Sequence, residues 1–326
     1  MTPEKNALKR MGGAWLDFWF PEPPLYNLAL MRMGTGLVLV YVLLVRSYDL
    51  DAQLFLLAKP SVMGALDQLA WPFSIFDWHD SSAWLWTVHI VAVTVAAAFL
   101  LGLFPLLSGA LGLVFLLSYA HRNPTVLLGL DSLLIMAMAY LILVPCGLKL
   151  SVPGGQIWPR QAREPPGPRS EEPEPMPWSG LPFRVLQIHL CLLYFQAGLG
   201  KLNAAWLDGL ALWHPRLLER GAPIDLDILR EFPFLLEAIP AGLALFELFF
   251  GVLIWLRPLR YPVLALAVAV HLGVGIGWQQ LPVNLLMIGL IVAFIRPAHA
   301  NWLLEHAGQL LAFVWQYAMA TWRAPR

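Results

Sequence analysis

The stretch RVLQIHLCLLYFQAGLGKLNAAW, from Arg184 to Trp206, decides the fold class. It begins as an apolar run long enough to enter a bilayer, and it ends on a lysine that is followed by Asn203 and Trp206. If the run is helical, residues spaced three and four apart form one stripe along its surface. The stripe consists of Arg184, Gln187, Cys191, Tyr194, Gly198 and Lys201. Because polar groups are costly in hydrocarbon, we expect the stripe to face other helices or a wet cavity rather than lipid.

Lys201, at the end of this run, has two interpretations. At the rim of an apolar cavity, loss of water favours the neutral amine, and the lysine is then a candidate general base. Alternatively, the side chain extends to the membrane surface and marks a helix end beside an interfacial tryptophan. Spacing alone favours the second interpretation, because most lysines near membrane helix ends have that role.

Composition extends the membrane assignment to the whole chain. Of the 326 residues, 59% are hydrophobic and 13% are charged, whereas a soluble domain carries about 25% charged residues. The formal net charge is zero, which argues against nucleic acid as a partner. Cys146 and Cys191 form neither a CxxC pair nor a zinc-ligand spacing, and no histidine recurs at helical spacing with a carboxylate. We therefore expect no metal site.

The apolar runs predict an all-α fold, a polytopic transmembrane bundle of about eight spans with interfacial helices at both ends. The expected spans are 25–46, 83–104, 106–120, 126–146, 181–201, 235–256, 261–278 and 281–296. They divide the chain into an interfacial N-terminal segment (1–24), a first helical half (25–150), a proline-rich linker (151–180), a second helical half (181–298) and an interfacial tail (299–326).

The distribution of basic residues predicts the orientation. With the N-terminus inside, the inner segments of this arrangement hold 13 Lys and Arg residues and the outer segments hold seven. We therefore expect an integral protein of a bacterial inner (cytoplasmic) membrane, with its N-terminus inside and Lys201 on the outer face.

Five ionisable residues lie in or at the rim of apolar runs: Arg32, Asp131, Lys201, Glu247 and His271. Such groups are functional-site hypotheses by default, and ion pairing is the main structural alternative. Arg32 is expected to form a structural ion pair with Asp131 or Glu247, because a buried arginine needs a partner. His271 is either a hydrogen-bond partner in packing or a catalytic group.

Several stretches together resemble one family. YFQAGLGKLNAAWLDG at 194–209 is similar to the lysine–leucine segment of vitamin K-dependent γ-carboxylase. LALMRMGTG around Arg32, RNPTVLLGLD at 122–131 and the late pair of Glu247 and His271 are similar to the same group. The broader group is the HTTM domain family of bacterial, carboxylase-like membrane proteins, and the resemblance covers about residues 25–296.

The resemblance implies a quinol-dependent enzyme of the carboxylase or epoxidase type, with a reduced, vitamin K-like quinone as cofactor and no metal. In the family a lysine is the base that acts on reduced vitamin K, and this role falls on Lys201, with His271 as a second catalytic group. The residues expected at the substrate are Arg122, Asn123, Asp131, Tyr194, Asn203, Trp206 and Glu247. The implied partners are the lipid bilayer and a lipid-soluble quinol or small hydrophobic substrate, with a peptide or partner protein as a further possibility.

Two departures from the family bear on the substrate. The carboxylase carries a large C-terminal domain that binds its protein substrate, whereas this chain ends about 30 residues after its last expected span. The histidine-containing loop of the animal enzyme is replaced here by RNP. We therefore expect chemistry on a quinol or another lipid-soluble substrate rather than protein γ-carboxylation. The alternative is a non-enzymatic membrane module that binds lipid or quinone, or a partner in secretion or immunity.

Overall fold

The computed structural model describes residues 3–52, 73–123, 129–152, 179–209, 232–277, 280–302, 304–306 and 309. These residues form helices and short turns, and no strand occurs among them. Most of the proline-rich linker, the joint at 124–128 and most of the C-terminal tail lie outside the described residues. The interpretations of those segments stay predictions.

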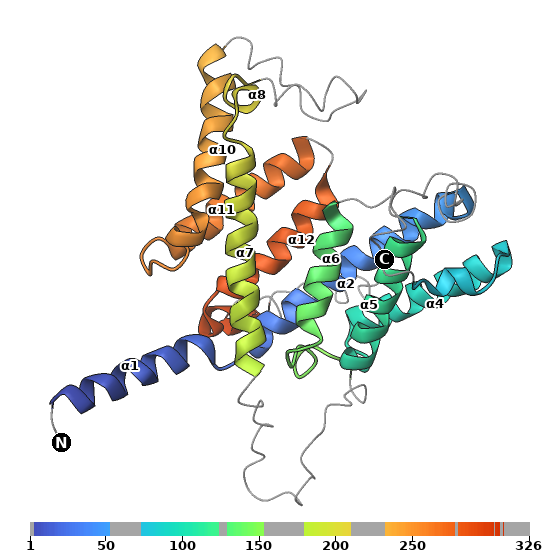
Figure 1. Cartoon of the computed structure of the whole chain (residues 1–326), viewed down its shortest axis with the longest axis horizontal. Helices are drawn as coiled ribbons and strands as arrows, with labels where there is room; N and C mark the ends of the chain where they lie inside the picture. Colours follow the sequence, from blue (N-terminus) through green and yellow to red (C-terminus); the bar gives the residue numbers. More distant parts are fainter. Residues whose placement is uncertain are drawn as a thin grey trace, which may run out of the picture.

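Within this part of the chain, a helix lies close to each expected span. These helices are α2 (Leu25–Arg46), α4 (Ser82–Leu101), α5 (Pro105–Arg122), α6 (Gly129–Leu141), α7 (Gly180–Gly200), α10 (Pro233–Leu253), α11 (Arg260–Gly277) and α12 (Leu281–Ile291). A further helix, α1 (Pro3–Trp19), precedes the bundle and projects from it, and the short α8 (Ala204–Leu207) follows α7 (Figure 1). Single 3-10 turns cover Ser47–Asp49, Ile75–Trp78 and Val292–Phe294.

Among the described residues, three helical segments are long and apolar enough to cross a membrane: Leu25–Asp49, Ser82–Leu101 and Arg260–Gly277. The apolar segments Gly129–Leu141 and Leu281–Phe294 are shorter. At 1.5 Å per residue such segments cover roughly 20 Å, against about 30 Å of hydrocarbon in a typical bilayer. The expectation of an all-α fold is therefore confirmed for the described residues, and three of their helical segments have the length and apolar composition of a membrane span.

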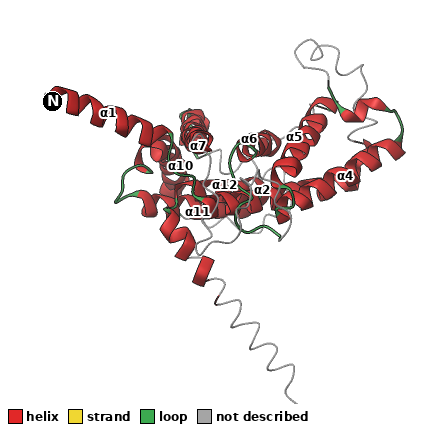
Figure 2. Cartoon of the chain, turned by 90° about the horizontal axis from the view of Figure 1, so that it is seen from below, coloured by secondary structure: helices red, strands yellow, loops and turns green. Residues whose placement is uncertain are grey.

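The start of one helix and the ends of its neighbours meet at one end of the bundle. Asn27, in the first turn of α2, donates two hydrogen bonds of 2.8 Å to the carbonyl groups of Val292 and Ile295, just after α12. Phe18 at the end of α1 lies beside Trp255, which follows α10. The start of α2 and the ends of α10 and α12 therefore lie on one side of the molecule. It follows that α2 runs antiparallel to α12 (Figures 1 and 2).

Two glycines permit close helix crossings. A Cβ atom on Gly36 of α2 would lie 2.7 Å from Cα of Leu100 on α4. A Cβ atom on Gly198 of α7 would lie 2.6 Å from the backbone nitrogen of Leu248 on α10. Both distances are shorter than any ordinary contact, so only glycine allows these backbones to approach, as small residues do in membrane bundles.

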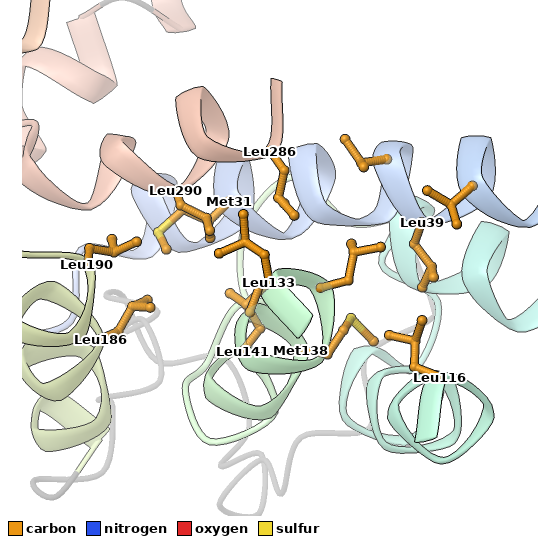
Figure 3. Close-up of a cluster of buried hydrophobic side chains, with 14 of the residues drawn as sticks. Met31, Leu39, Leu116, Leu133, Met138, Leu141, Leu186, Leu190, Leu286 and Leu290 are labelled. Atoms are coloured by element: carbon orange, nitrogen blue, oxygen red, sulfur yellow. The ribbon is translucent and has the colours of Figure 1, made fainter. Parts of the chain in front are cut away.

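The apolar core lies where α6 contacts α2, and it continues to α7 and α12. Figure 3 shows the buried leucine and methionine side chains that meet there. They are Met31, Leu39, Leu116, Leu133, Met138, Leu141, Leu186, Leu190, Leu286 and Leu290. Because these residues come from both halves of the sequence, the two halves share one core.

Arg32 of α2 is completely buried, and backbone carbonyl groups hold its guanidinium group. Nη1 donates to Phe99 and Leu100 at 2.9 and 3.1 Å, at the C-terminal end of α4. Nη2 and Nε donate to Leu150 and Cys146 at 2.6 and 3.2 Å. The last carbonyls of a helix have no partner within it and carry partial negative charge. The arginine therefore caps α4 and ties the segment after α6 to it.

This arrangement corrects the expected ion pair of Arg32. Of the two carboxylates considered, Asp131 pairs with Arg46 and Glu247 pairs with Lys201. The sequence could not show that helix-end carbonyls would supply acceptors for a buried arginine, because these come from residues far along the chain.

Candidate functional site

The polar stripe predicted on α7 faces neighbouring helices. Gln187 and Tyr194 are buried, whereas Leu192 and Leu199 on the opposite face are exposed. Gln187 donates a hydrogen bond of 2.7 Å to the carbonyl group of Ala293, beside α12. The expectation drawn from the three-and-four spacing is confirmed, and the stripe becomes one wall of a seam between α7 and α10.

Lys201 forms an ion pair with Glu247 at one end of this seam. The residue follows the last turn of α7, and its Nζ atom lies 2.6 Å from Oε2 of Glu247 on α10. Nζ also donates to the carbonyl group of Ala197 at 3.3 Å and lies 5.1 Å from the ring centre of Trp206. The two paired side chains are 16% and 14% exposed. The amine is therefore partly shielded, close to a carboxylate and covered by an indole ring.

The short helix α8 brings Trp206 to this position. The side-chain oxygen of Asn203 accepts a hydrogen bond of 3.2 Å from the backbone nitrogen of Trp206, and its amide donates to the carbonyl group of Gly200 at 2.8 Å. This is the capping role that asparagine commonly plays at the first residue of a helix. Asn203, which was expected at the substrate, thus acts here on the local backbone.

Tyr194 begins a chain of hydrogen bonds across three helices. Its hydroxyl group lies 2.6 Å from Nε2 of His271 on α11, and Nδ1 of His271 lies 2.8 Å from Oδ1 of Asn284 on α12. The amide nitrogen of Asn284 donates to the carbonyl group of Gln280 at 2.8 Å. The tyrosine ring stacks on Phe250 of α10, with ring centres 3.8 Å apart. Every polar side-chain atom in this series of hydrogen bonds has a partner, as buried polar groups require.

The ion pair and the hydrogen-bond chain lie along the same seam. Tyr194 and Lys201 are seven residues apart, which is two turns on one face of α7, or about 10 Å along the axis. The lysine side chain bends back toward Ala197, which shortens this separation. We call Tyr194, Lys201, Glu247, His271 and Asn284 the second-half cluster.

The remaining predicted substrate residues have partners in the first half of the chain. Arg122 at the end of α5 pairs with Asp77 and Asp80. Asn123 is buried at the C-terminal cap of α5. Asp131 pairs with Arg46 at 2.6 Å. The structure therefore brings together five of the predicted site residues, namely Tyr194, Lys201, Trp206, Glu247 and His271.

Asp131 belongs to a first-half cluster of Arg46, Ser47, His89, Tyr119 and Asp131. The guanidinium carbon of Arg46 lies 5.0 Å from the ring centre of Tyr119. The hydroxyl group of Tyr119 lies 2.5 Å from Nδ1 of His89, and Nε2 of His89 lies 2.8 Å from the hydroxyl oxygen of Ser47. The helices that supply this cluster are α2, α4, α5 and α6, with Ser47 just after α2.

Sequence reasoning missed Asn284 and His89. Each is a polar residue within an apolar run, LPVNLLMIGL and TVHIVAVTV. An isolated polar residue in such a run is itself a signal for an intramembrane partner. Arg46 was missed for another reason: it is the last residue of the expected span 25–46, and the orientation count places it among the outer basic residues.

The described part of the chain contains no group of three or more His, Cys, Asp or Glu side chains placed to hold a metal ion. Comparison of the chain with protein-family models, curated proteins and solved structures finds no match. The function has to be argued from the site, since one helical fold serves many activities.

Proposed function

We propose that the protein is a membrane enzyme of the HTTM, carboxylase-like type, in which Lys201 takes a hydroxyl proton from a reduced, lipid-soluble quinone. The observation that carries this proposal is the pairing of Lys201 with Glu247 at 2.6 Å, beside Trp206 and at the end of an apolar helix. A lysine that only extends to the membrane surface needs no carboxylate partner, whereas Lys201 has one on α10.

The carboxylate gives the lysine a way to become a base. A lysine ammonium group has to lose its proton before it can accept another, and Oε2 of Glu247 is within hydrogen-bond distance to receive that proton. Where substrate excludes water, the neutral amine and the neutral carboxylic acid are both favoured over the charged forms. The amine can then take the hydroxyl proton of the bound substrate, as general-base catalysis requires.

The donor set suits a reduced quinone. The seam offers an amine, a carboxylate, a phenol and an imidazole, together with the rings of Trp206 and Phe250. Such a quinol supplies the electrons with which oxygen is reduced as the ring is converted to an epoxide. Exposed apolar residues near the lysine, Leu199 and Leu202, provide a surface across which a lipid-soluble molecule can approach.

The proposal includes the arrangement in the membrane. It has about eight crossings of a bacterial inner membrane, with the N-terminus inside and Lys201 outside. This arrangement fits the excess of basic residues on the side of the membrane that holds the N-terminus. In support, α7 carries Arg184 near its start and Lys201 at its end, a separation of 17 residues. This corresponds to about 25 Å along the axis, which is close to the thickness of a hydrocarbon core. Charged residues would thus lie near both surfaces.

The test is an epoxidation assay on the purified protein in detergent or nanodiscs. Reduced menaquinone or reduced vitamin K is supplied with oxygen, and the epoxide is measured by mass spectrometry. We expect epoxide from the wild type and a loss of about 100-fold or more in Lys201→Ala, the scale of general-base catalysis. Lys149→Ala is the matched control, since Lys149 also lies against an aromatic ring, Tyr26, but is not part of the second-half cluster. No epoxide from wild type, or equal amounts from Lys201→Ala, rejects the proposal.

The same ion pair also favours a second, non-catalytic function. In this function the protein binds lipid or quinone, or it is a membrane partner in secretion or immunity. Both charges of Lys201 and Glu247 are satisfied within the protein, as a purely structural pair also requires. Lys201→Arg separates the two functions, because arginine keeps the charge but cannot give up its proton. A non-catalytic protein tolerates this change and retains quinone on lipid extraction, whereas the enzyme loses epoxide formation.

A further inference from the structure

We propose that Asn284 is a positioning residue that holds His271 with its proton on Nδ1, so that the hydroxyl group of Tyr194 donates to the bare Nε2 atom. The protonation state follows from geometry alone. Its consequence for a quinol rests on the proposed function. The second-half cluster then contains a second proton acceptor beside Lys201.

The first step is the orientation of the Asn284 side chain. Its Nδ2 atom lies 2.8 Å from the carbonyl oxygen of Gln280, which can only accept a hydrogen bond. The amide nitrogen must therefore point toward Gln280, and Oδ1 must point toward His271. A flipped amide would set two oxygen acceptors against each other.

The second step fixes the tautomer of His271. Oδ1 of Asn284 only accepts, and it lies 2.8 Å from Nδ1 of the ring, so Nδ1 must carry a proton. A neutral imidazole then has a lone pair on Nε2. The hydroxyl oxygen of Tyr194 lies 2.6 Å from that atom, so the phenol is the donor and the ring is the acceptor.

The third step is that packing keeps Asn284 in place. Asn284 and Tyr194 are 6% and 4% exposed. Gly275 on α11 allows α12 to approach, because a Cβ atom there would lie 3.1 Å from Cβ of Asn284. With the partners buried and the backbones close, the chain of hydrogen bonds has little freedom to rearrange.

This arrangement makes the tyrosine oxygen a relay. A proton moves from the Tyr194 oxygen to Nε2 of His271, which becomes an imidazolium ion that still donates from Nδ1 to Asn284. The tyrosine oxygen can then accept a proton from a substrate hydroxyl group, which restores the phenol. One O–H bond of the substrate is broken, one N–H bond is formed on His271, and no electrons are exchanged. A quinol has two hydroxyl groups, and the seam would offer Lys201 for one and Tyr194 for the other.

The experiment reads the protonation of His271 directly. The protein is labelled with ¹⁵N-histidine, and ring-nitrogen NMR spectra are recorded at neutral pH in nanodiscs without substrate, with His271 identified by the signal lost in His271→Gln. We expect a protonated Nδ1 and a bare Nε2 in the wild type. In Asn284→Leu the acceptor is gone, and we expect the proton to move to Nε2, which then donates to the tyrosine oxygen.

Asn27→Leu is the matched control. Asn27, like Asn284, is a buried residue whose amide donates to backbone carbonyl groups, but its acceptors are Val292 and Ile295, so its loss should leave the His271 signals unchanged. A wild-type spectrum with the proton on Nε2 overturns the inference even if Asn284→Leu does not fold. An unchanged tautomer in folded Asn284→Leu also overturns it.

The outcome is separable from that of the epoxidation assay. If wild type forms no epoxide but His271 shows the expected tautomer, the proposed function fails and the positioning role stands. If epoxide forms, we expect Asn284→Leu to lower turnover by about 10- to 100-fold, on the scale of a displaced proton acceptor. Turnover that is equal in Asn284→Leu and Asn27→Leu then shows that the relay does not serve the reaction.

Discussion

Among the described residues, each half of the molecule has a cluster that contains a cation–carboxylate pair and a tyrosine–histidine pair, but the two clusters differ in what they can do. In the first-half cluster, Arg46 pairs with Asp131, and their side chains are 10% and 3% exposed. In the second-half cluster, Lys201 pairs with Glu247, and their side chains are 16% and 14% exposed. The first pair is more deeply enclosed and contains a guanidinium group, which keeps its proton under all ordinary conditions.

The difference in residue type matters more than the difference in exposure. Arg46 lies against the ring of Tyr119, and its guanidinium group holds a fixed charge beside Asp131. A lysine and a glutamate can instead both become neutral when the proton moves between them. The cation–carboxylate pair is thus a fixed connection between helices in the first half, and in the second half it is available for proton transfer.

The largest expected effect comes from removing the carboxylate charge of each pair. Asp131→Asn leaves the charge of Arg46 without its carboxylate, and we expect the free energy of unfolding to fall by about 3–5 kcal/mol. Glu247→Gln leaves a lysine that is able to deprotonate, and we expect a smaller loss, about 1–2 kcal/mol. Denaturant titrations in detergent micelles, followed by circular dichroism, give both values. Equal losses would mean that the two pairs play the same structural role.

A second effect tests the close approach of α7 and α10, on which the second-half cluster depends. Gly198→Ala places a Cβ atom 2.6 Å from the backbone nitrogen of Leu248, so the helices must separate. We expect a loss of about 1–3 kcal/mol, the usual cost of overpacking, and weaker pairing of Lys201 with Glu247. Gly200→Ala is the control, because its Cβ atom would meet nothing within 4 Å. A loss of the same size in Gly200→Ala, where alanine favours the helix and meets no neighbour, would show that the loss in Gly198→Ala does not come from the close approach of α7 and α10.

A third and smaller effect comes from exchanging the two cations. Arg46→Lys keeps the charge but loses the planar group that lies over Tyr119, and we expect a loss of about 1–2 kcal/mol. Lys201→Arg keeps a cation next to Glu247 at a partly exposed site, and we expect a change in stability of less than about 1 kcal/mol. Thermal unfolding of the two variants under identical conditions compares them. A larger loss in Lys201→Arg would show that the second-half pair is the more constrained of the two.

Much of the fold could be read from the sequence, because the periodicity of apolar residues is local. The run from Leu25 to Arg46 and the stripe on α7 required only the spacing of three and four residues. Pairing of residues distant in sequence was harder to anticipate. The sequence identified Lys201, Glu247 and His271 as isolated polar residues, but it contained no signal that joined Lys201 to Glu247 or His271 to Tyr194.

Arg32 shows why such partners escape sequence reasoning. Its acceptors are main-chain carbonyl groups at the end of α4 and after α6, and every residue has a carbonyl group. Side-chain chemistry therefore gave no clue to them, and a carboxylate was the natural expectation. The pair of Arg46 and Asp131 joins two side chains, and it was missed because the two residues are 85 positions apart in the sequence.

The smallest expected effect concerns Asp51. This residue lies just beyond the first spanning segment, and its side chain forms hydrogen bonds with the next one, α4. Its carboxylate accepts hydrogen bonds from the hydroxyl group of Ser82 at 2.6 Å and from the indole nitrogen of Trp86 at 3.1 Å, both on α4. These bonds, the first above all, hold the pKa of Asp51 below its usual 3.8. Asp51 belongs to neither cluster and follows the first spanning segment, so it provides a comparison with both of them.

The sign of the effect follows from the direction of this pKa shift. Because the folded protein binds the Asp51 proton less readily than the unfolded chain, the contribution to stability is complete above pH 3.8 and is lost as the pH falls through the lowered pKa. We expect Asp51→Asn to remove this part of the acid dependence while leaving the stability at neutral pH nearly unchanged, since the site is exposed. Thermal unfolding of wild type and variant between about pH 2 and 6 measures it. Curves that stay parallel down to the lowest pH would show that the hydrogen bonds from α4 do not bind the carboxylate more tightly than water does.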